Sequence, residues 1–203
     1  MTLDQIAIKY GTDKASQGPM IHDYARHYAK HFDPIRDKCI SLLEIGVDEG
    51  KSINTWLEYF PKATICGIDD IARGYPVDPR YTFVHGDQAD EGFLIHFGSK
   101  HGSDWDIIID DGGHHNREII LSFMHLWPLV RPGGLYCIED LGVHYIHPNR
   151  HLFGLPPHLV HTVGGYPTAL EWLRSLIDEM NCGRGNIDEF SLTQELAILR
   201  KKS

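Results

Sequence analysis

The chain has 203 residues, of which 42% are hydrophobic and 23% are charged, a balance typical of a globular protein. Its 28 acidic side chains outnumber its 19 basic ones, so the formal net charge is −9. Because the nucleic-acid backbone favours proteins with dense Lys and Arg, this charge argues against a nucleic-acid partner. A chain of this length can bury a sufficient core without disulfides, and we predict a single domain over residues 1–203.

Cysteine usage and the N-terminal residues bear on where the protein works. None of the 4 cysteines has the spacing of a zinc site or a redox motif. No apolar run is long enough to span a bilayer, and the first residues lack the basic and apolar regions of a signal peptide. We therefore expect a cytoplasmic protein with no membrane partner.

Along the chain, the pattern of apolar residues predicts an α/β fold. Residues 1–38 indicate two short helices, which we expect to form an N-terminal helical cap. Short apolar runs then alternate with amphipathic segments, which is typical of βαβ units and a parallel sheet. Helices are predicted around Ile53–Phe60, around Ile119–Trp127 and from Pro167 to Met180. The predicted strands are Ile40–Ile45, Thr64–Ile68, Tyr81–Val84, Asp106–Ile109, Leu135–Ile138, Ile187–Leu192 and Leu196–Arg200.

These elements predict a Rossmann-like, doubly wound, mostly parallel seven-stranded sheet with an antiparallel strand near the C-terminus. The turn Arg131-Pro132-Gly133-Gly134 leads into one of the strands. Residues 141–166 are rich in Pro and Gly, and a long connection of this kind is usually functional. We expect it to be a loop or lid on the substrate side.

Ligands of open α/β sheets bind beyond the carboxyl ends of the strands, and three strands here end distinctively. Gly46 follows the first strand and Gly50 begins the next helix, so the backbone can approach a ligand closely. Asp69 ends the second strand, where a carboxylate can accept hydrogen bonds from the hydroxyls of a ribose. Asp87 and Gln88 follow the third strand, and these polar groups suit an adenine edge.

The same region distinguishes between two cofactors. A dinucleotide-binding loop has the pattern Gly-x-Gly-x-x-Gly, whereas Gly46 and Gly50 lack the middle glycine. Glu44 lies inside the strand end, where it would repel a pyrophosphate but not the cationic α-amino group of S-adenosylmethionine. S-adenosylmethionine is therefore favoured over a nicotinamide cofactor, and the alternative is a plain strand-to-helix turn.

Acidic residues also end the fourth and fifth strands, as Asp110-Asp111 and Glu139-Asp140. If these ends are neighbours, the carboxylates need a cation to offset their repulsion, and oxygen ligands favour Mg²⁺. We predict Asp111, Glu139 and Asp140 as metal ligands. His114 is the predicted general base, since imidazole suits proton transfer near neutral pH and a metal makes a sugar hydroxyl easier to deprotonate. In the alternative interpretation, Asp110 and Asp111 cap the following helix and His114 only packs.

Several of these motifs together resemble one family, the S-adenosylmethionine-dependent, Mg²⁺-dependent O-methyltransferases that act on macrolide sugars, such as the mycinamicin and macrocin enzymes. The resemblance extends over most of the chain from Ile8. It includes Lys9-Tyr10-Gly11-Thr12-Asp13-Lys14, Leu42-Leu43-Glu44-Ile45-Gly46-Val47, Gly67-Ile68-Asp69, Gly86-Asp87-Gln88, Ile109-Asp110-Asp111-Gly112-Gly113-His114 and Ile138-Glu139-Asp140-Leu141.

The resemblance implies a class I methyltransferase fold, an oligomer and a role in antibiotic or other secondary metabolism. It implies metal ligands at Asp111, Glu139 and Asp140, and a base at either His114 or Asp111. Gly113 departs from the family, which usually has Ser there. With Gly50 added from its spacing, the predicted cofactor contacts are Thr12, Glu44, Gly46, Gly50, Ser52, Asp69, Asp87, Gln88 and Asp111.

The predicted reaction is methyl transfer to a hydroxyl of a small metabolite, and we expect this hydroxyl to belong to a sugar or polyol. An amine or a phenol is an alternative acceptor. A protein that binds S-adenosylmethionine without turnover, inside a biosynthetic assembly, is a second alternative, and a nicotinamide-dependent oxidoreductase is the weakest.

Overall fold

The structure is a computed structural model that describes residues 1–18, 21–73, 76–144, 168–193 and 195–203. The chain groups into two compact units, Met1–Asp87 and Gln88–Ser203, each of which is described by itself. The seven strands form a mixed sheet, so the predicted α/β fold class is confirmed. Whether residues 1–203 act as one domain stays a prediction.

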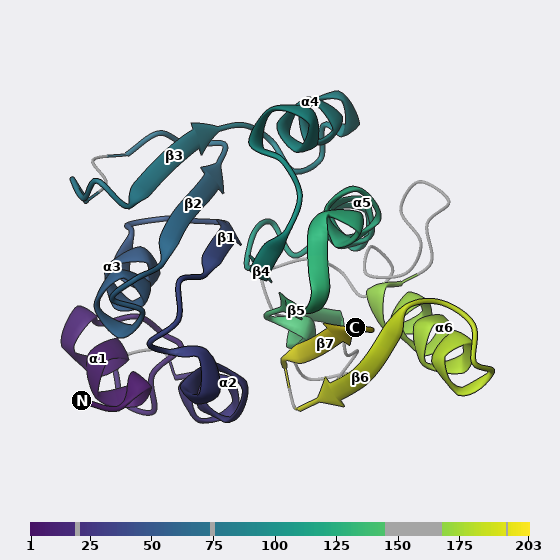
Figure 1. Cartoon of the computed structure of the whole chain (residues 1–203), viewed down its shortest axis with the longest axis horizontal. Coiled ribbons are helices and arrows are strands. Elements are labelled where there is room, and N and C mark those ends of the chain that lie inside the picture. Colours follow the sequence, from purple (N-terminus) through teal and green to yellow (C-terminus); the bar gives the residue numbers. More distant parts are fainter. Residues whose placement is uncertain (19–20, 74–75, 145–167, 194) are drawn as a thin grey trace. The chain divides into compact units, whose positions relative to one another are not determined.

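The first unit contains three parallel strands in the order β3-β2-β1 (Figure 1). They are β1 (Ser41–Ile45), β2 (Thr64–Asp69) and β3 (Tyr81–His85), each within one residue of its predicted bounds. β1 and β2 are almost wholly buried, which explains their continuous apolar character. Their parallel pairing brings the carboxyl ends of β1 and β2 to the same edge, since Ile45 is aligned with Ile68.

Three helices accompany these strands: α1 (Leu3–Tyr10), α2 (Ala25–Phe32), which the short 3₁₀ turn η1 (Asp33–Ile35) follows, and α3 (Lys51–Tyr59). The two helices predicted in residues 1–38 are therefore present, and their role as a cap stays a prediction. Phe32 and Tyr28 are fully buried and pack edge-on against Trp56 of α3. This aromatic cluster fixes α2 against α3 within the unit.

The second unit contains β4 (Trp105–Asp110), β5 (Val130–Ile138), β6 (Ile187–Leu192) and β7 (Ala197–Lys201), in the order β4-β5-β7-β6. β4 and β5 are parallel, whereas β7 is antiparallel to both β5 and β6. The predicted antiparallel strand near the C-terminus is therefore confirmed. Because Asp110 is aligned with Ile138, the acidic residues that follow β4 and β5 emerge at the same edge.

The predicted turn at Arg131–Gly134 lies inside β5 as an irregularity of the pairing. Trp105 is aligned with Val130, but Ile107 is aligned with Leu135, so the extra residues bulge out of the ladder. Gly133 has a left-handed φ of 73°, which this bulge requires. The glycines thus mark a bulge rather than a loop between two elements.

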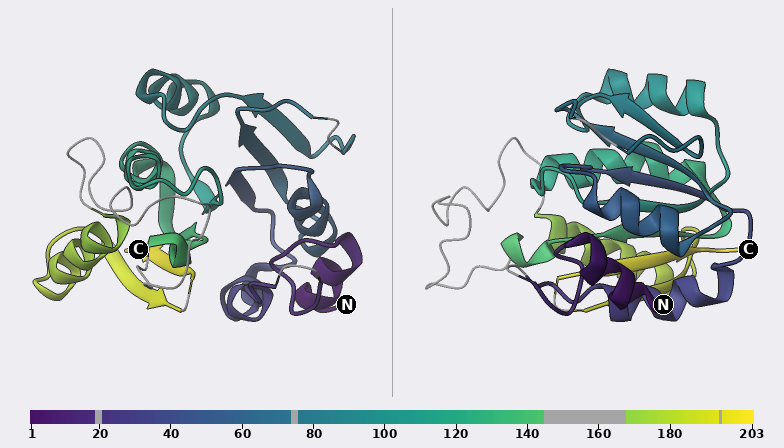
Figure 2. Two further views of the ribbon diagram at one scale, coloured as in Figure 1. Left: turned by 180° about the vertical axis from the view of Figure 1, so that it is seen from behind. Right: turned by 90° about the vertical axis from the view of Figure 1, so that its left-hand side faces the viewer.

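The described residues of the second unit also form the helices α4 (Glu91–His101), α5 (Asn116–Leu126) and α6 (Ala169–Asn181) and the short 3₁₀ turns η2 (Trp127–Leu129) and η3 (Leu141–His144). Helix α5 packs between α4 and α6, and Figure 2 shows α4 and α5 side by side. The sequence prediction included α5 and α6 but missed α4. Its segment contains Gly92 and Gly98, and its apolar residues form no clear stripe, so the helical period is weak.

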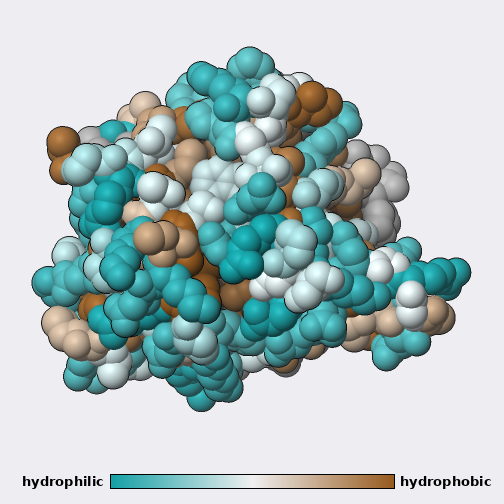
Figure 3. Space-filling view, viewed as in Figure 1, coloured by the Kyte–Doolittle hydropathy of each residue, from teal (hydrophilic) through white to brown (hydrophobic). Residues whose placement is uncertain are grey.

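Most of the surface in Figure 3 is hydrophilic, in keeping with the charged composition. In the described part of the chain, no helix is both long and apolar enough to cross a lipid bilayer. Of the predicted lid over residues 141–166, only Leu141–His144 lies within the described residues.

Candidate cofactor and metal sites

The glycine loop of the first unit depends on backbone conformations that most residues avoid. Gly46 and Gly50 have φ values of 82° and 75°, and Asp48 between them has a φ of 46°. The Gly50 N–H donates to the Val47 carbonyl oxygen at 2.8 Å, which closes a tight turn before α3. Both glycines are therefore required by the backbone conformation of the turn. At these two positions no side chain covers the backbone near the end of β1.

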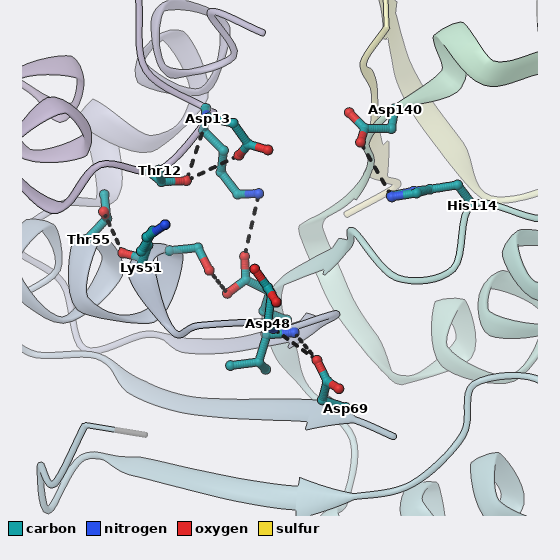
Figure 4. Close-up of polar contacts among 12 residues, drawn as sticks. Thr12, Asp13, Asp48, Lys51, Thr55, Asp69, His114 and Asp140 are labelled. Atoms are coloured by element: carbon teal, nitrogen blue, oxygen red, sulfur yellow. Dashed lines mark hydrogen bonds and ion pairs between the residues drawn. The ribbon is translucent and has the colours of Figure 1, made fainter. Parts of the chain in front are cut away.

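Asp69, at the end of β2, holds this loop in place. Its Oδ2 accepts the N–H groups of Val47 at 2.8 Å and Asp48 at 2.9 Å (Figure 4). Its Oδ1 accepts the N–H of Ile71 at 2.8 Å. A carboxylate has about four acceptor sites, so about one remains, on Oδ1. The predicted contact of Asp69 with a ribose fits this geometry for one hydroxyl rather than for both.

Glu44 lies in a buried ion pair that the sequence analysis did not foresee. Its side chain is 0% exposed, and its Oε1 is 3.9 Å from the Nζ of Lys14, which is 2% exposed. Its Oε2 accepts a hydrogen bond from the hydroxyl of Ser52 at 2.7 Å. Lys14 therefore already offsets the charge of Glu44, which weakens the argument that Glu44 attracts the α-amino group. Glu44 and Ser52 stay predicted cofactor contacts, and they lie together.

The other predicted cofactor residues of this unit differ in exposure. Thr12 is 5% exposed and lies in the turn after α1, where its hydroxyl contacts the Asp13 carboxylate at 3.4 Å (Figure 4). Gly11 ends α1 with a left-handed φ of 71°. Asp87 is exposed at the end of the unit. The motif around Gly11 and Thr12 thus ends α1 and forms the turn that precedes the buried Lys14.

In the second unit, the ends of β4 and β5 bring three of the predicted residues together. Asp111, His114 and Asp140 each offer a ligand atom, and these atoms lie within 4.8 Å of one another. The Nε2 of His114 is 3.4 Å from Oδ2 of Asp140, as Figure 4 shows. Two carboxylates and one imidazole at this spacing could hold a divalent cation, and Mg²⁺ is commonly bound through one or two carboxylates plus water.

Both His114 and Asp140 have a strained backbone. Their φ values are 57° and 55°, in the left-handed region that costs a non-glycine residue about 1 kcal/mol or more. Residues held in this way concentrate at functional sites, because the surrounding structure must impose the conformation. The strain at two facing residues agrees with a functional role for this cluster.

Glu139, the third predicted metal ligand, is only 1% exposed and is not a member of the cluster of Asp111, His114 and Asp140. Its N–H donates to the carbonyl oxygen of Asp110 at 3.0 Å, which extends the pairing of β4 and β5 by one bond. Its role as a ligand stays a prediction.

The alternative in which Asp110 and Asp111 cap the next helix is wrong. His115 is the N-cap of α5, and its N–H donates to the Glu118 carboxylate at 3.2 Å. Asp110 is 2% exposed and accepts from the Tyr136 hydroxyl and from the Gln88 amide, each at 3.2 Å. Burial raises the pKa of Asp110 to about 7, although these hydrogen bonds act in the opposite direction.

Two of the residues that hold the site were not predicted from the sequence. Tyr136 and Ser122 are fully buried and contact Asp110 and Gln88, respectively. Tyr136 lies in an apolar stretch of β5 and Ser122 in an apolar stretch of α5. In the sequence, only the polar atom of each residue indicates that it could form a hydrogen bond at the site.

The strands and helices form a Rossmann-like α/β fold of the kind found in methyltransferases. Two curated relatives are the mycinamicin VI 2''-O-methyltransferase of Micromonospora griseorubida, 36% identical over 150 residues, and the L-olivosyl-oleandolide 3-O-methyltransferase of Streptomyces antibioticus, 33% identical over 188 residues. These alignments cover 70% and 88% of this chain, but only 37% and 46% of the relatives.

A solved structure agrees. The MycE methyltransferase from the mycinamycin biosynthetic pathway, in complex with Mg and SAH, matches with a TM-score of 0.82 and 31% identity, over 100% of this chain and 55% of its own length. No model of a protein family matches the chain. The chain is thus related in sequence and fold to O-methyltransferases that act on macrolide sugars, as the motifs predicted, and it spans about half their length or less.

Proposed function

We propose that the protein is an S-adenosylmethionine-dependent, Mg²⁺-assisted O-methyltransferase that acts on a sugar or polyol hydroxyl of a glycosylated small metabolite in antibiotic or related secondary metabolism. The observation that carries the proposal is the cluster of Asp111, His114 and Asp140. It supplies oxygen ligands and a base at one strand edge, in a chain related to sugar O-methyltransferases.

In this proposal, the first unit binds the cofactor. The bare backbone at Gly46 and Gly50 and the remaining acceptor site of Asp69 suit its ribose and methionine parts. S-adenosylmethionine, when bound, supplies a methyl group on a cationic sulfur, and Mg²⁺, when bound, lowers the pKa of a neighbouring hydroxyl.

The second unit holds the cation and moves the proton. Asp111 and Asp140 bind the cation, with Glu139 as a further predicted ligand. The contact of His114 Nε2 with the Asp140 carboxylate favours the tautomer that carries its proton on Nε2. Nδ1 is then the atom that accepts the proton of the acceptor hydroxyl, and Asp140 stabilises the resulting imidazolium. Asp111 is the alternative proton acceptor.

The test is methyl transfer from labelled S-adenosylmethionine to a panel of glycosylated metabolites and polyols, with Mg²⁺ or with EDTA. We expect transfer that EDTA abolishes. His114→Ala should reduce the rate about 10²–10⁴-fold, the usual contribution of a general base. His125→Ala, a histidine of α5 outside the cluster, is the control. Full activity of both His114→Ala and Asp111→Ala would contradict the mechanism.

The Mn²⁺ affinity of the His114→Gln variant separates two roles for the imidazole. An unchanged affinity supports the base, whereas a clear fall means that His114 is a metal ligand, as its place in the cluster also allows. Transfer that resists EDTA would favour a phenol acceptor, and transfer to an amine would favour the other alternative.

Tight binding of S-adenosylhomocysteine without transfer to any acceptor would favour a non-catalytic partner. Thermal stabilisation by NAD but not by S-adenosylhomocysteine would favour an oxidoreductase. We also propose a homo-oligomer in the cytoplasm, which size-exclusion chromatography and cell fractionation can test.

A further inference from the structure

Both side-chain N–H groups of Gln88 form hydrogen bonds inside the second unit. Its Nε2 donates to Asp110 Oδ1 at 3.2 Å and to Ser122 Oγ at 3.0 Å, and its Oε1 accepts the N–H of Gly113 at 2.8 Å. A primary amide has two N–H donors, and both are used here. With a side chain that is only 7% exposed, Gln88 has no donor left for the adenine edge that its sequence position suggested.

Gly112 lies directly against this amide. A Cβ atom at position 112 would overlap Oε1 of Gln88 and lie 2.6 Å from its Cδ and 3.1 Å from its Nε2. These three atoms are the nearest neighbours of that Cβ, so Gln88 is what excludes a side chain there. The φ of Gly112 is not in the left-handed region, so its backbone conformation does not by itself exclude alanine.

The Gln88 side chain therefore anchors the loop between β4 and α5 on both sides of Gly112. Asp110 contributes its carboxylate to the anchor, and Gly113 contributes its backbone N–H. Asp111 and His114 are the chain neighbours of these anchored residues, so Gln88 holds the backbone next to both of them.

We propose that Gln88 is a positioning residue for the loop that carries Asp111 and His114, and not a contact for adenine. It acts through Asp110 and Gly113. The part of the proposal that concerns the metal rests on the proposed function, whereas the close packing of Gln88 on Gly112 does not.

A double-mutant cycle tests the close packing by thermal unfolding. Gly112→Ala alone should lower the Tm, because the new methyl group displaces the Gln88 amide. In the Gln88→Ala background, Gly112→Ala should have little further effect, because the obstructing atoms are gone. Additive losses, or a Gly112→Ala variant as stable as the wild type, would overturn the proposal.

Binding measurements test the positioning role. Gln88→Met keeps the length of the side chain and removes its hydrogen bonds. We expect the Mn²⁺ affinity to fall about tenfold, as is usual when a residue that orients metal ligands is removed, with the affinity for S-adenosylhomocysteine unchanged. Ser122→Ala removes only one partner of the amide and should have a smaller effect in the same direction.

The opposite pattern, loss of S-adenosylhomocysteine affinity with Mn²⁺ affinity intact, would restore the adenine contact and overturn the proposal. An equal loss of both would mean a general structural defect and would also overturn it. If the wild-type protein binds neither ligand, the proposed function fails, and the double-mutant cycle still decides whether Gln88 anchors the loop.

Discussion

The acidic side chains at the strand ends of the two units have different kinds of partner. In the first unit, Asp69 accepts three backbone N–H groups, and the buried Glu44 faces Lys14. In the second unit, Asp111 and Asp140 share one edge with the imidazole of His114. The first edge is thus organised by its own donors, whereas the second concentrates negative charge. Only the second should gain much stability from a cation.

The largest expected effect comes from removing the internal cation of the first edge. Lys14→Met leaves the charge of Glu44 buried, which should lower the free energy of unfolding by about 3–5 kcal/mol, measured by urea denaturation. Adding Glu44→Gln should recover much of this loss. As a control, Lys9→Met removes an exposed pair with Glu58 and should cost much less, because water screens an exposed pair. Similar losses in the two lysine variants would remove the contrast between the edges.

The second edge should respond to metal. At a Mg²⁺ concentration about 100-fold above its Kd, the wild type should gain about 2.7 kcal/mol of unfolding free energy. Asp111→Asn should abolish this gain, and in EDTA it should be neutral or stabilising, because it removes a negative charge beside the Asp140 carboxylate. The measurement is urea denaturation with and without Mg²⁺. A gain that persists in Asp111→Asn would place the cation elsewhere.

Asp69→Asn should have a smaller effect, of about 1–2 kcal/mol, because the amide oxygen replaces only part of a charge-assisted set of hydrogen bonds. The loss should be the same in Mg²⁺ and in EDTA, and the affinity for S-adenosylhomocysteine should fall with it. If the loss depended on Mg²⁺, the two edges would not be energetically separate.

The smallest effect is a gain. Asp140→Gly in EDTA should raise the unfolding free energy by about 1 kcal/mol, because glycine accepts the φ of 55° at little cost. In Mg²⁺ the same variant should lose the metal-dependent gain. A destabilised variant in EDTA would mean that Asp140 contributes contacts worth more than its strain.

The sequence predicted the strand ends well, because a buried parallel strand is a continuous apolar run and its end is marked by the first polar residue. It could not predict which way each side chain turns. Glu139 and Asp140 are equivalent as sequence, yet only Asp140 joins His114 in the cluster.

Contacts between residues that are distant in the sequence could not be predicted either. No local pattern connects Lys14 to Glu44, and nothing near Gln88 indicates that its amide turns toward Asp110. Helix α4 was missed for a local reason, because its glycines and its weak apolar stripe conceal the helical period.

The backbone conformation of Asp140 has a consequence for evolutionary drift. Every aspartate codon becomes a glycine codon by one A-to-G change, and here that change relieves strain. In a gene copy released from selection for activity, the substitution is both accessible and favourable to folding. We therefore expect inactive descendants of this chain to carry Gly at position 140. The residue at this one position would then distinguish inactive copies from active ones.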